Sequence, residues 1–219
     1  MDAAYREIYS RNIGIFTEAE QDKLRRSAIA IAGVGGIGGL LAERLIRLGV
    51  GRLKITDPGA FEHSNFNRQF ASSMLTLGQN KAEVIYAQLR DINPEARIDY
   101  SSNGIKSEND ASLFVADCDV VIDEMDYDLF KQAIYLQRAA RKQGLHYLFA
   151  SALGFGALVV IFGPQGMTLE EYDNLPPNVD LKGIEGLPMP LDKIVPVIPS
   201  YATHDALKKI YAAGQAAAR

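Results

Sequence analysis

The sequence contains a single cysteine, Cys118. One cysteine can form neither an intramolecular disulfide nor a cysteine-rich zinc site, so we expect no structural zinc. We expect Cys118 itself to be a small buried residue with no catalytic role. The shortage of cysteine also favours the reducing cytoplasm as the compartment in which the protein works.

The sequence also has no excess of positive charge and no long uninterrupted apolar run. The formal net charge is −4, which gives no support for nucleic acid as a partner. The most apolar stretch, residues 145–162, is interrupted by His146, Ser151 and two glycines, so it predicts two buried strands around a glycine turn and not a membrane span. The first residues carry charges and no apolar segment, so we expect no signal peptide and no membrane partner.

Apolar periodicity predicts strands that alternate with helices. The capping box at Thr17 and Glu20 predicts a helix over 17–26. The other expected helices and strands, in chain order, are strand 28–33, helix 36–48, strand 52–57, helix 78–91, strand 98–101, helix 107–116, strand 119–123, helix 128–143 and strand 146–151. This alternation predicts an α/β class, a Rossmann-like three-layer fold with a largely parallel central sheet and an antiparallel C-terminal extension.

The composition changes after Gly163. Seven of the nine prolines lie in residues 164–199, which predicts a mostly irregular but ordered excursion over the site or onto a second subunit. A closing helix is expected from about Thr203, and its alanine-rich end is consistent with a chain cut from a longer one. We therefore divide the chain into a nucleotide-binding domain, 1–163, and an appendage, 164–219, packed on the same domain.

The segment "GVGGIGG" at 33–39 follows the first strand and begins a helix. Gly33, Gly35 and Gly38 fit the G-x-G-x-x-G pattern of loops that hold nucleotide phosphates. Asp57 ends the second strand, where dinucleotide-binding folds place a carboxylate that accepts hydrogen bonds from ribose. These residues alone suit a dinucleotide and ATP equally well.

The loop that follows carries more information. Its polar residues are Asn65, Asn67, Arg68 and Gln69, and Lys81 comes soon after, in the first turn of a helix. The glycine loop and a helix N-terminus can largely satisfy a pyrophosphate. Two further cations at the same edge therefore indicate more negative charge, as in a triphosphate with a departing pyrophosphate.

The sequence resembles the ThiF/MoeB/E1 adenylyltransferase superfamily over residues 5 to about 163. The segments that carry the resemblance are "YSRNI" (9–13), "AGVGGIGG" (32–39), "GVGRLKITDPGAFEHSNFNRQF" (49–70), "LGQNKAE" (77–83), "INPEARI" (92–98) and "DVVIDEMD" (119–126). N-x-x-R-Q after a strand-ending aspartate, followed by G-Q-x-K, is far more specific than the glycine pattern.

The resemblance implies a role for each matching residue. Gly36 would lie against the phosphates, Asp57 would hold the ribose, and Asp126 would coordinate Mg²⁺. Asn65 and Arg68 would contact the triphosphate, Gln69 would support them, and Lys81 would reach the phosphates from its helix. Arg11 matches an arginine that reaches the γ-phosphate of the neighbouring subunit, which implies a homodimer.

The implied reaction needs ATP and Mg²⁺ and no zinc. A substrate carboxylate, expected to be the C-terminus of a small ubiquitin-like or sulfur-carrier protein or a peptide, becomes an acyl-adenylate as pyrophosphate leaves. The nucleophile is already ionised at neutral pH, so no general base is required and the protein supplies position and positive charge.

The chain departs from the family pattern after Asp126. Tyr127 and Lys131 stand where the family usually has asparagine and arginine, and the two C-x-x-C zinc pairs of many members are missing. Two alternatives stay open. The glycine loop and Asp57 alone allow a Rossmann oxidoreductase that binds NAD(P) or FAD, and Tyr127 and Lys131 allow a catalytically inactive E1-like partner or scaffold.

Overall fold

The computed structural model describes residues 3–153, 156–184 and 193. Its centre is a six-stranded sheet in the order β3-β2-β1-β4-β5-β6. The strands are β1 (Ala28–Ala32), β2 (Arg52–Thr56), β3 (Arg97–Ser101), β4 (Val120–Asp123), β5 (His146–Leu153) and β6 (Gly156–Phe162). The first five pair in parallel and β6 pairs antiparallel with β5. The expected α/β class with a largely parallel sheet and an antiparallel extension is therefore confirmed.

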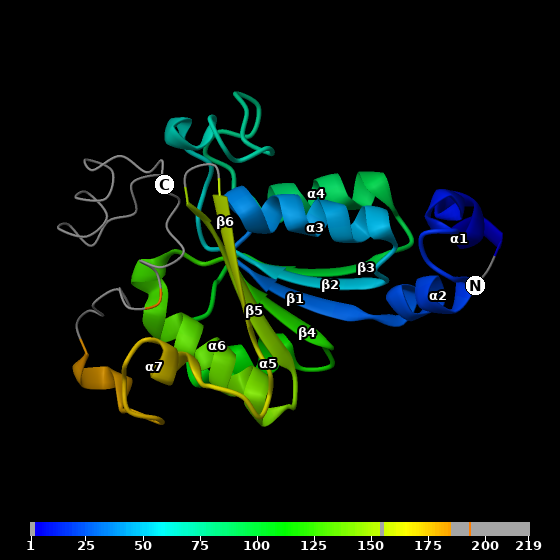
Figure 1. Cartoon of the computed structure of the whole chain (residues 1–219). Helices are drawn as coiled ribbons and strands as arrows, with labels where there is room; N and C mark the ends of the chain where they lie inside the picture. Colours follow the sequence, from blue (N-terminus) through cyan, green and yellow to red (C-terminus); the bar gives the residue numbers. More distant parts are fainter. Residues whose placement is uncertain (1–2, 154–155, 185–192, 194–219) are drawn as a thin grey trace.

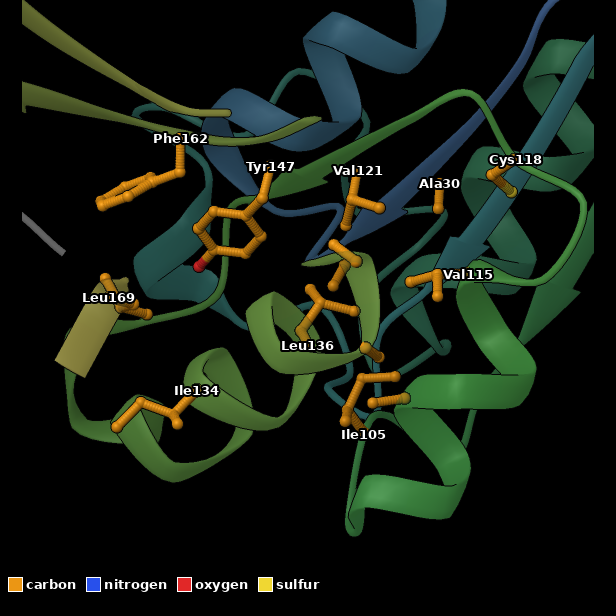
Figure 2. Packing of buried hydrophobic residues seen from close by; sticks show 14 of the residues in the cluster. Ala30, Ile105, Val115, Cys118, Val121, Ile134, Leu136, Tyr147, Phe162 and Leu169 are labelled. Carbon is orange, nitrogen blue, oxygen red and sulfur yellow. The ribbon is translucent and has the colours of Figure 1, made fainter. Parts of the chain in front are cut away.

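Helices cover both faces of the sheet and complete three layers (Figure 1). On one face, α3 (Gly36–Leu48) and α4 (Lys81–Ile92) pack on Ile31, Leu53 and Ile55. On the other face lie α5 (Glu108–Val115), α6 (Phe130–Lys142) and α7 (Leu169–Tyr172). Figure 2 shows this second core, in which Val121 and Tyr147 of the sheet meet Leu136 of α6 and Leu169 of α7. Cys118 belongs to the same core and is buried, as expected.

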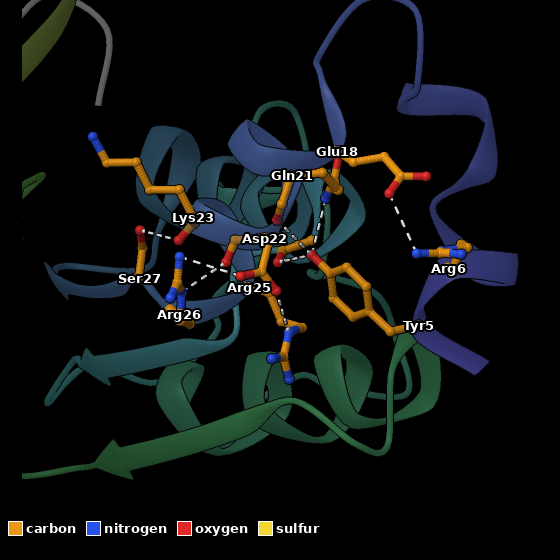
Figure 3. Close-up of polar contacts among 10 residues, drawn as sticks. Tyr5, Arg6, Glu18, Gln21, Asp22, Lys23, Arg25, Arg26 and Ser27 are labelled. Carbon is orange, nitrogen blue, oxygen red and sulfur yellow. Dashed lines mark hydrogen bonds and ion pairs between the residues drawn. The ribbon is translucent and has the colours of Figure 1, made fainter. Parts of the chain in front are cut away.

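The N-terminal helices α1 (Ala3–Ile8) and α2 (Glu18–Arg26) lie where β1 begins, far from the start of α3 (Figure 1). Thr17 and Glu20 form the predicted capping box of α2. Tyr5 donates a hydrogen bond to the carbonyl of Gly49, and Gln21 donates one to the Tyr5 hydroxyl (Figure 3). These contacts fix the N-terminal segment to the C-terminal end of α3. None of the helices in the described ranges is long and apolar enough to cross a membrane.

One helix boundary and one expected burial differ clearly from the structure. Helix α4 begins at Lys81 and not at residue 78, because Gly78 has a positive φ of 79° and Asn80 caps the helix by accepting from the N–H of Glu83. The two strands in 145–162 were expected to be buried, yet Val159 and Ile161 of β6 are 57% and 64% exposed. Strand β6 lies at the edge of the sheet, and no described helix covers that face of it.

The described part of the proline-rich excursion packs against α6. Arg138 of α6 donates to Glu170 at 2.9 Å and to the carbonyl of Val179 at 2.7 Å. Leu169 and Leu181 join the buried core of that layer. The division into 1–163 and 164–219 stays a prediction, and the expected closing helix lies outside the described residues.

The glycine loop (residues 33–38) is packed so closely that it fixes the start of α3. A Cβ placed on Gly38 would lie 1.9 Å from the carbonyl oxygen of Gly33, and one on Gly33 would lie 2.4 Å from the carbonyl oxygen of Glu124. Gly33 also has a positive φ of 84°, which side chains rarely adopt. By contrast, a Cβ on Gly36 would meet only atoms of Arg68, at 3.8 Å or more. The protein's own packing therefore requires glycine at 33 and 38 and not at 36.

We predict that Gly38→Ala destabilises the fold by at least about 2 kcal/mol, because its methyl group overlaps the Gly33 carbonyl and α3 must move. Gly36→Ala is the control, and it should leave the free energy of unfolding unchanged or slightly higher, since alanine favours a helix. Urea denaturation of both variants measures this. Equal destabilisation by the two changes would contradict the packing described above.

We also predict that Arg138→Met lowers the free energy of unfolding by about 3 kcal/mol. The change leaves the carboxylate of Glu170, whose side chain is 2% exposed, without its charged partner. Arg47→Met breaks the ion pair with Glu43 at a site where Arg47 is 52% exposed, and it should cost less than about 1 kcal/mol. Similar losses for the two variants in urea titrations would show that Arg138 does not anchor the excursion.

Candidate nucleotide-binding site

The first turn of α3 and the carboxyl end of β2 meet at Asp57. Its carboxylate is 8% exposed and accepts from the N–H of Val34 at 2.9 Å and from the N–H of Gly59 at 2.8 Å. Asp57 therefore ties the glycine loop to the turn that follows β2. A carboxylate has further lone pairs, so this role is compatible with a hydrogen bond from a ribose hydroxyl.

Arg68 lies over the start of α3. Its Cγ is beside Gly36, and Nη1 donates to the carbonyl of Ser64 at 2.8 Å and to the side-chain oxygen of Asn67 at 3.2 Å. The guanidinium is exposed, and these two contacts hold it near the helix N-terminus. Both Arg68 and the helix end favour an anion at this point.

Gln69 points at the glycine loop from the same segment. It is 6% exposed, and its Nε2 would lie 3.2 Å from a Cβ on Gly35. Its Oε1 is buried and has no hydrogen-bond partner among the described residues. A buried oxygen without a donor is costly, so a ligand or a water molecule that donates to it fits this position.

The loop holds its remaining predicted residues in different ways. Asn65 is 5% exposed and accepts from the N–H of Glu62, so it shapes the loop itself. Lys81 begins α4, and its Nζ would lie 3.4 Å from a Cβ on Gly59, next to the turn that Asp57 caps. Asp57, Arg68 and Lys81 are thus gathered around the glycine loop at one edge of the sheet.

Carboxyl groups line the neighbouring side of the loop, where β4 ends. Asp123 is 5% exposed and accepts from the Tyr147 hydroxyl at 2.5 Å and from the N–H of Met125 at 2.9 Å. Burial raises the pKa of Asp123 to about 6, and it also raises the pKa of Tyr147. Asp126 follows and occupies the N-cap position of a short 3-10 helix, Tyr127–Leu129, without a side-chain capping hydrogen bond. The described residues contain no group of three or more His, Cys, Asp or Glu side chains that could hold a metal ion, and the Mg²⁺ role of Asp126 stays a prediction.

Glu124 lies in the DVVIDEMD segment, but the sequence motifs assigned no role to it. Its backbone lies against Gly33, its Cβ lies against Gly38, and its Oε1 accepts from the N–H of Ala150 at 3.2 Å. Burial, followed by the charge of Asp123, raises the pKa of Glu124 to about 8. Its place in the DVVIDEMD segment, directly after a buried strand, was the available signal.

Arg11 lies away from this site. Its neighbours Tyr9 and Asn12 donate to the carbonyls of Ile46 and Leu48. These carbonyls are at the end of α3, a helix of 13 residues that is about 20 Å long and whose other end holds Gly36. Arg11 therefore cannot reach the glycine loop of its own chain.

The excursion contacts the site through the residue after Asp126. Burial raises the pKa of Tyr127, and the charge of Asp173, just beyond α7, raises it further. Burial also raises the pKa of Asp173 to about 7. Tyr127 is thus close enough to the excursion to feel the charge of Asp173, although it is 37% exposed, and Lys131 lies over the ring of Phe130. These two residues have local partners in place of the family's usual asparagine and arginine.

A separate cavity of about 720 Å³ lies on the other face of the sheet. It is lined by Lys54 and Thr56 of β2, Asp99 of β3, Lys106 and Phe114 among others. Its lining includes Thr56, the residue before Asp57, but neither the glycine loop nor Arg68, Lys81 or Asp126. The chemistry of the glycine loop, the two cations and Asp126 is therefore on an open edge of the sheet and not in this cavity.

Comparison with known proteins agrees with the geometry. The tRNA threonylcarbamoyladenosine dehydratase of Bacillus subtilis (strain 168) is 33% identical over 137 residues, 63% of this chain and 53% of that protein. The sulfur carrier protein ThiS adenylyltransferase of the same strain is 30% identical over 136 residues, 61% of this chain and 40% of that protein. The matched part thus spans about half the length of these relatives.

A solved structure of E. coli MccB with ATP superposes with a TM-score of 0.65 and 25% identity, covering 75% of this chain and 52% of that one. The ThiF family matches residues 9–216, which is nearly the whole sequence. The resemblance read from the glycine loop, the N-x-x-R-Q segment and the DVVIDEMD segment is therefore confirmed, and this chain belongs to the ThiF family.

Proposed function

We propose that this chain is an adenylyltransferase that uses ATP to convert a substrate carboxylate into an acyl-adenylate. The observation that carries the proposal is the grouping of Arg68 and Lys81 around the glycine loop. A dinucleotide pyrophosphate needs little beyond the loop and the helix N-terminus, whereas a triphosphate uses both cations. The relative named as an adenylyltransferase and the MccB structure with ATP support this choice.

The residues suit ATP in further respects. The open space above Gly36 allows phosphates to approach the first N–H groups of α3, and the buried Oε1 of Gln69 lacks a donor among the described residues. Asp57 would hold the ribose, and Asn65 and Asn67 would keep Arg68 in position. Asp126 would hold Mg²⁺, which when bound supplies positive charge to the phosphates.

The reaction needs no proton transfer. A carboxylate oxygen of the substrate attacks the α-phosphorus, and the bond to the oxygen that bridges the α- and β-phosphorus breaks. Pyrophosphate leaves with the electron pair, so negative charge grows on it as the bond lengthens. Arg68 and Lys81 stabilise that charge, and the fixed start of α3 holds the α-phosphate in place for the attack.

We infer that the substrate is the C-terminal carboxylate of a small carrier protein or peptide. The relative that acts as an adenylyltransferase of the sulfur carrier protein ThiS supports this partner class. In this chain Glu124 contacts both the glycine loop and Ala150, so we propose that the carboxylate approaches the glycine loop along this edge.

We further propose a homodimer in which Arg11 serves the partner's site. Since α3 separates Arg11 from its own glycine loop by about 20 Å, only a second copy can bring the guanidinium there. The segments near the two ends of α3 contain exposed apolar side chains. Ile8 and Ile15 flank Arg11 in the sequence, and Met74 and Leu75 belong to the loop after Arg68. A two-fold axis would pack one end against the other and bury both.

We predict that ATP–pyrophosphate exchange appears with the correct carrier and falls about 10²–10³-fold in Arg68→Ala, because a charge-stabilising donor is lost. Arg44→Ala is the control, since Arg44 is an exposed arginine of α3 whose removal should leave exchange unchanged. Exchange is measured with labelled pyrophosphate. If wild type binds ATP but exchanges with no carrier, the inactive scaffold is the correct reading.

We predict that Arg11→Ala and Arg68→Ala each lower exchange strongly, Arg68→Ala by about 10²–10³-fold, but complement one another. When equal amounts are mixed and allowed to exchange subunits, half of the dimers are mixed and each has one complete site. Activity should then recover to about a quarter of the wild-type value. If Arg11 acts within its own chain, or not at all, mixing restores nothing.

A further inference from the structure

Strand β5 continues past the end of its neighbour β4. The parallel pairing with β4 ends at Asp123 and Phe149, whereas the antiparallel pairing with β6 continues to Leu153 and Gly156. Within the part of the chain that the structure describes, residues 150–153 therefore have a neighbouring strand, β6, on one side only. We call this unpaired side the free edge of β5 (residues 150–153).

Alternation along the strand determines which groups face this edge. The N–H of Ala150 points to the β4 side, since it donates to Oε1 of Glu124. Every second residue of a strand directs its N–H and C=O to the same side, so both groups of Ala152 face the free edge. Ser151 faces β6 instead. Ala152 is exposed, and since its main-chain groups point away from β6, the β5–β6 ladder gives them no partner.

The free edge leads directly to the glycine loop. Glu124, which fills the position where β4 stops, touches both Gly33 and Gly38. A chain that lies along the edge and runs toward Glu124 would bring its C-terminal carboxylate toward the N-terminus of α3 and Arg68. Positive charge at both of these places favours a carboxylate. The edge is four residues long, about 13 Å, which suits a short extended tail.

We propose that the last residues of the carrier add to the sheet as a short antiparallel strand along the free edge of β5. The N–H and C=O of Ala152 pair with one tail residue, and Glu124 closes the inner end of the edge. This inference rests on the proposed adenylation of a C-terminal carboxylate. Main-chain hydrogen bonds then provide affinity and register for the tail, whatever its side chains are.

A pair of proline variants tests the protein side. Ala152→Pro removes an N–H that faces the free edge and that the β5–β6 ladder does not use. Val159→Pro is the matched control, because Val159 pairs with Ala150 and its N–H faces away from β5 on the outer side of β6. The probe is a fluorescein-labelled hexapeptide that ends in Gly-Gly with a free carboxylate, titrated in the presence of ATP. Ala152→Pro should weaken binding about tenfold, and Val159→Pro should not.

A second set of probes tests the tail without changing the protein. Single N-methyl groups are placed in turn on the last four amides of the hexapeptide. Binding to wild type should weaken only at alternate positions, because only every second amide of a strand faces its neighbour.

The outcomes separate this inference from the proposed function. Equal affinity of the two proline variants, N-methyl effects without alternation, or ATP binding without any binding of the probe would each overturn docking on β5 and leave adenylation standing. Failure of wild type to bind ATP would instead overturn the proposed function.

Discussion

The candidate site depends on how closely the first turn of α3 approaches the ends of β1 and β4. No atom larger than hydrogen fits between Gly38 and the carbonyl of Gly33, or between Gly33 and the backbone of Glu124. This contact fixes the helix N-terminus against the edge of the sheet, and the hydrogen bond from Val34 to Asp57 fixes it from the other side. The backbone donors of α3 are therefore already oriented before any phosphate arrives, and no reorganisation is required when charge develops.

Charge is divided across the glycine loop. Arg68 and Lys81 lie on the side of β2 and α4, whereas Asp123, Glu124 and Asp126 lie where β4 ends. The cationic side suits the phosphates of a nucleotide. The carboxyl side suits a metal ion. Burial, followed by the charge of Asp123, raises the pKa of Glu124 to about 8, so Glu124 is largely protonated near neutral pH and adds little repulsion of a carboxylate, whereas Asp123, with a pKa of about 6, is mostly ionised there. In the proposed function, the two substrates would reach the helix end from different sides.

The sequence predicted those parts of the structure that depend on local signals. The capping box predicted α2, helical spacing of leucines predicted α3, and the glycine pattern with Asp57 predicted the turn between β1 and α3. The exposed face of β6 was missed because an apolar strand looks the same whether or not a helix covers it. The contacts of Glu124 with Gly33 and Gly38, and the anchoring of the excursion through Arg138 and Glu170, connect residues far apart in the chain, and no local pattern encodes them. The roles of Arg11 and Asp126 rest on the family resemblance and stay predictions.

The central claim is that the glycine loop holds ATP and not a dinucleotide. Isothermal titration of the wild-type chain with ATP in the presence of Mg²⁺, and separately with NADH, tests it most directly. The geometry around Arg68, Lys81 and Gln69 predicts that ATP binds and that NADH does not. Tight binding of NADH without binding of ATP would contradict the account.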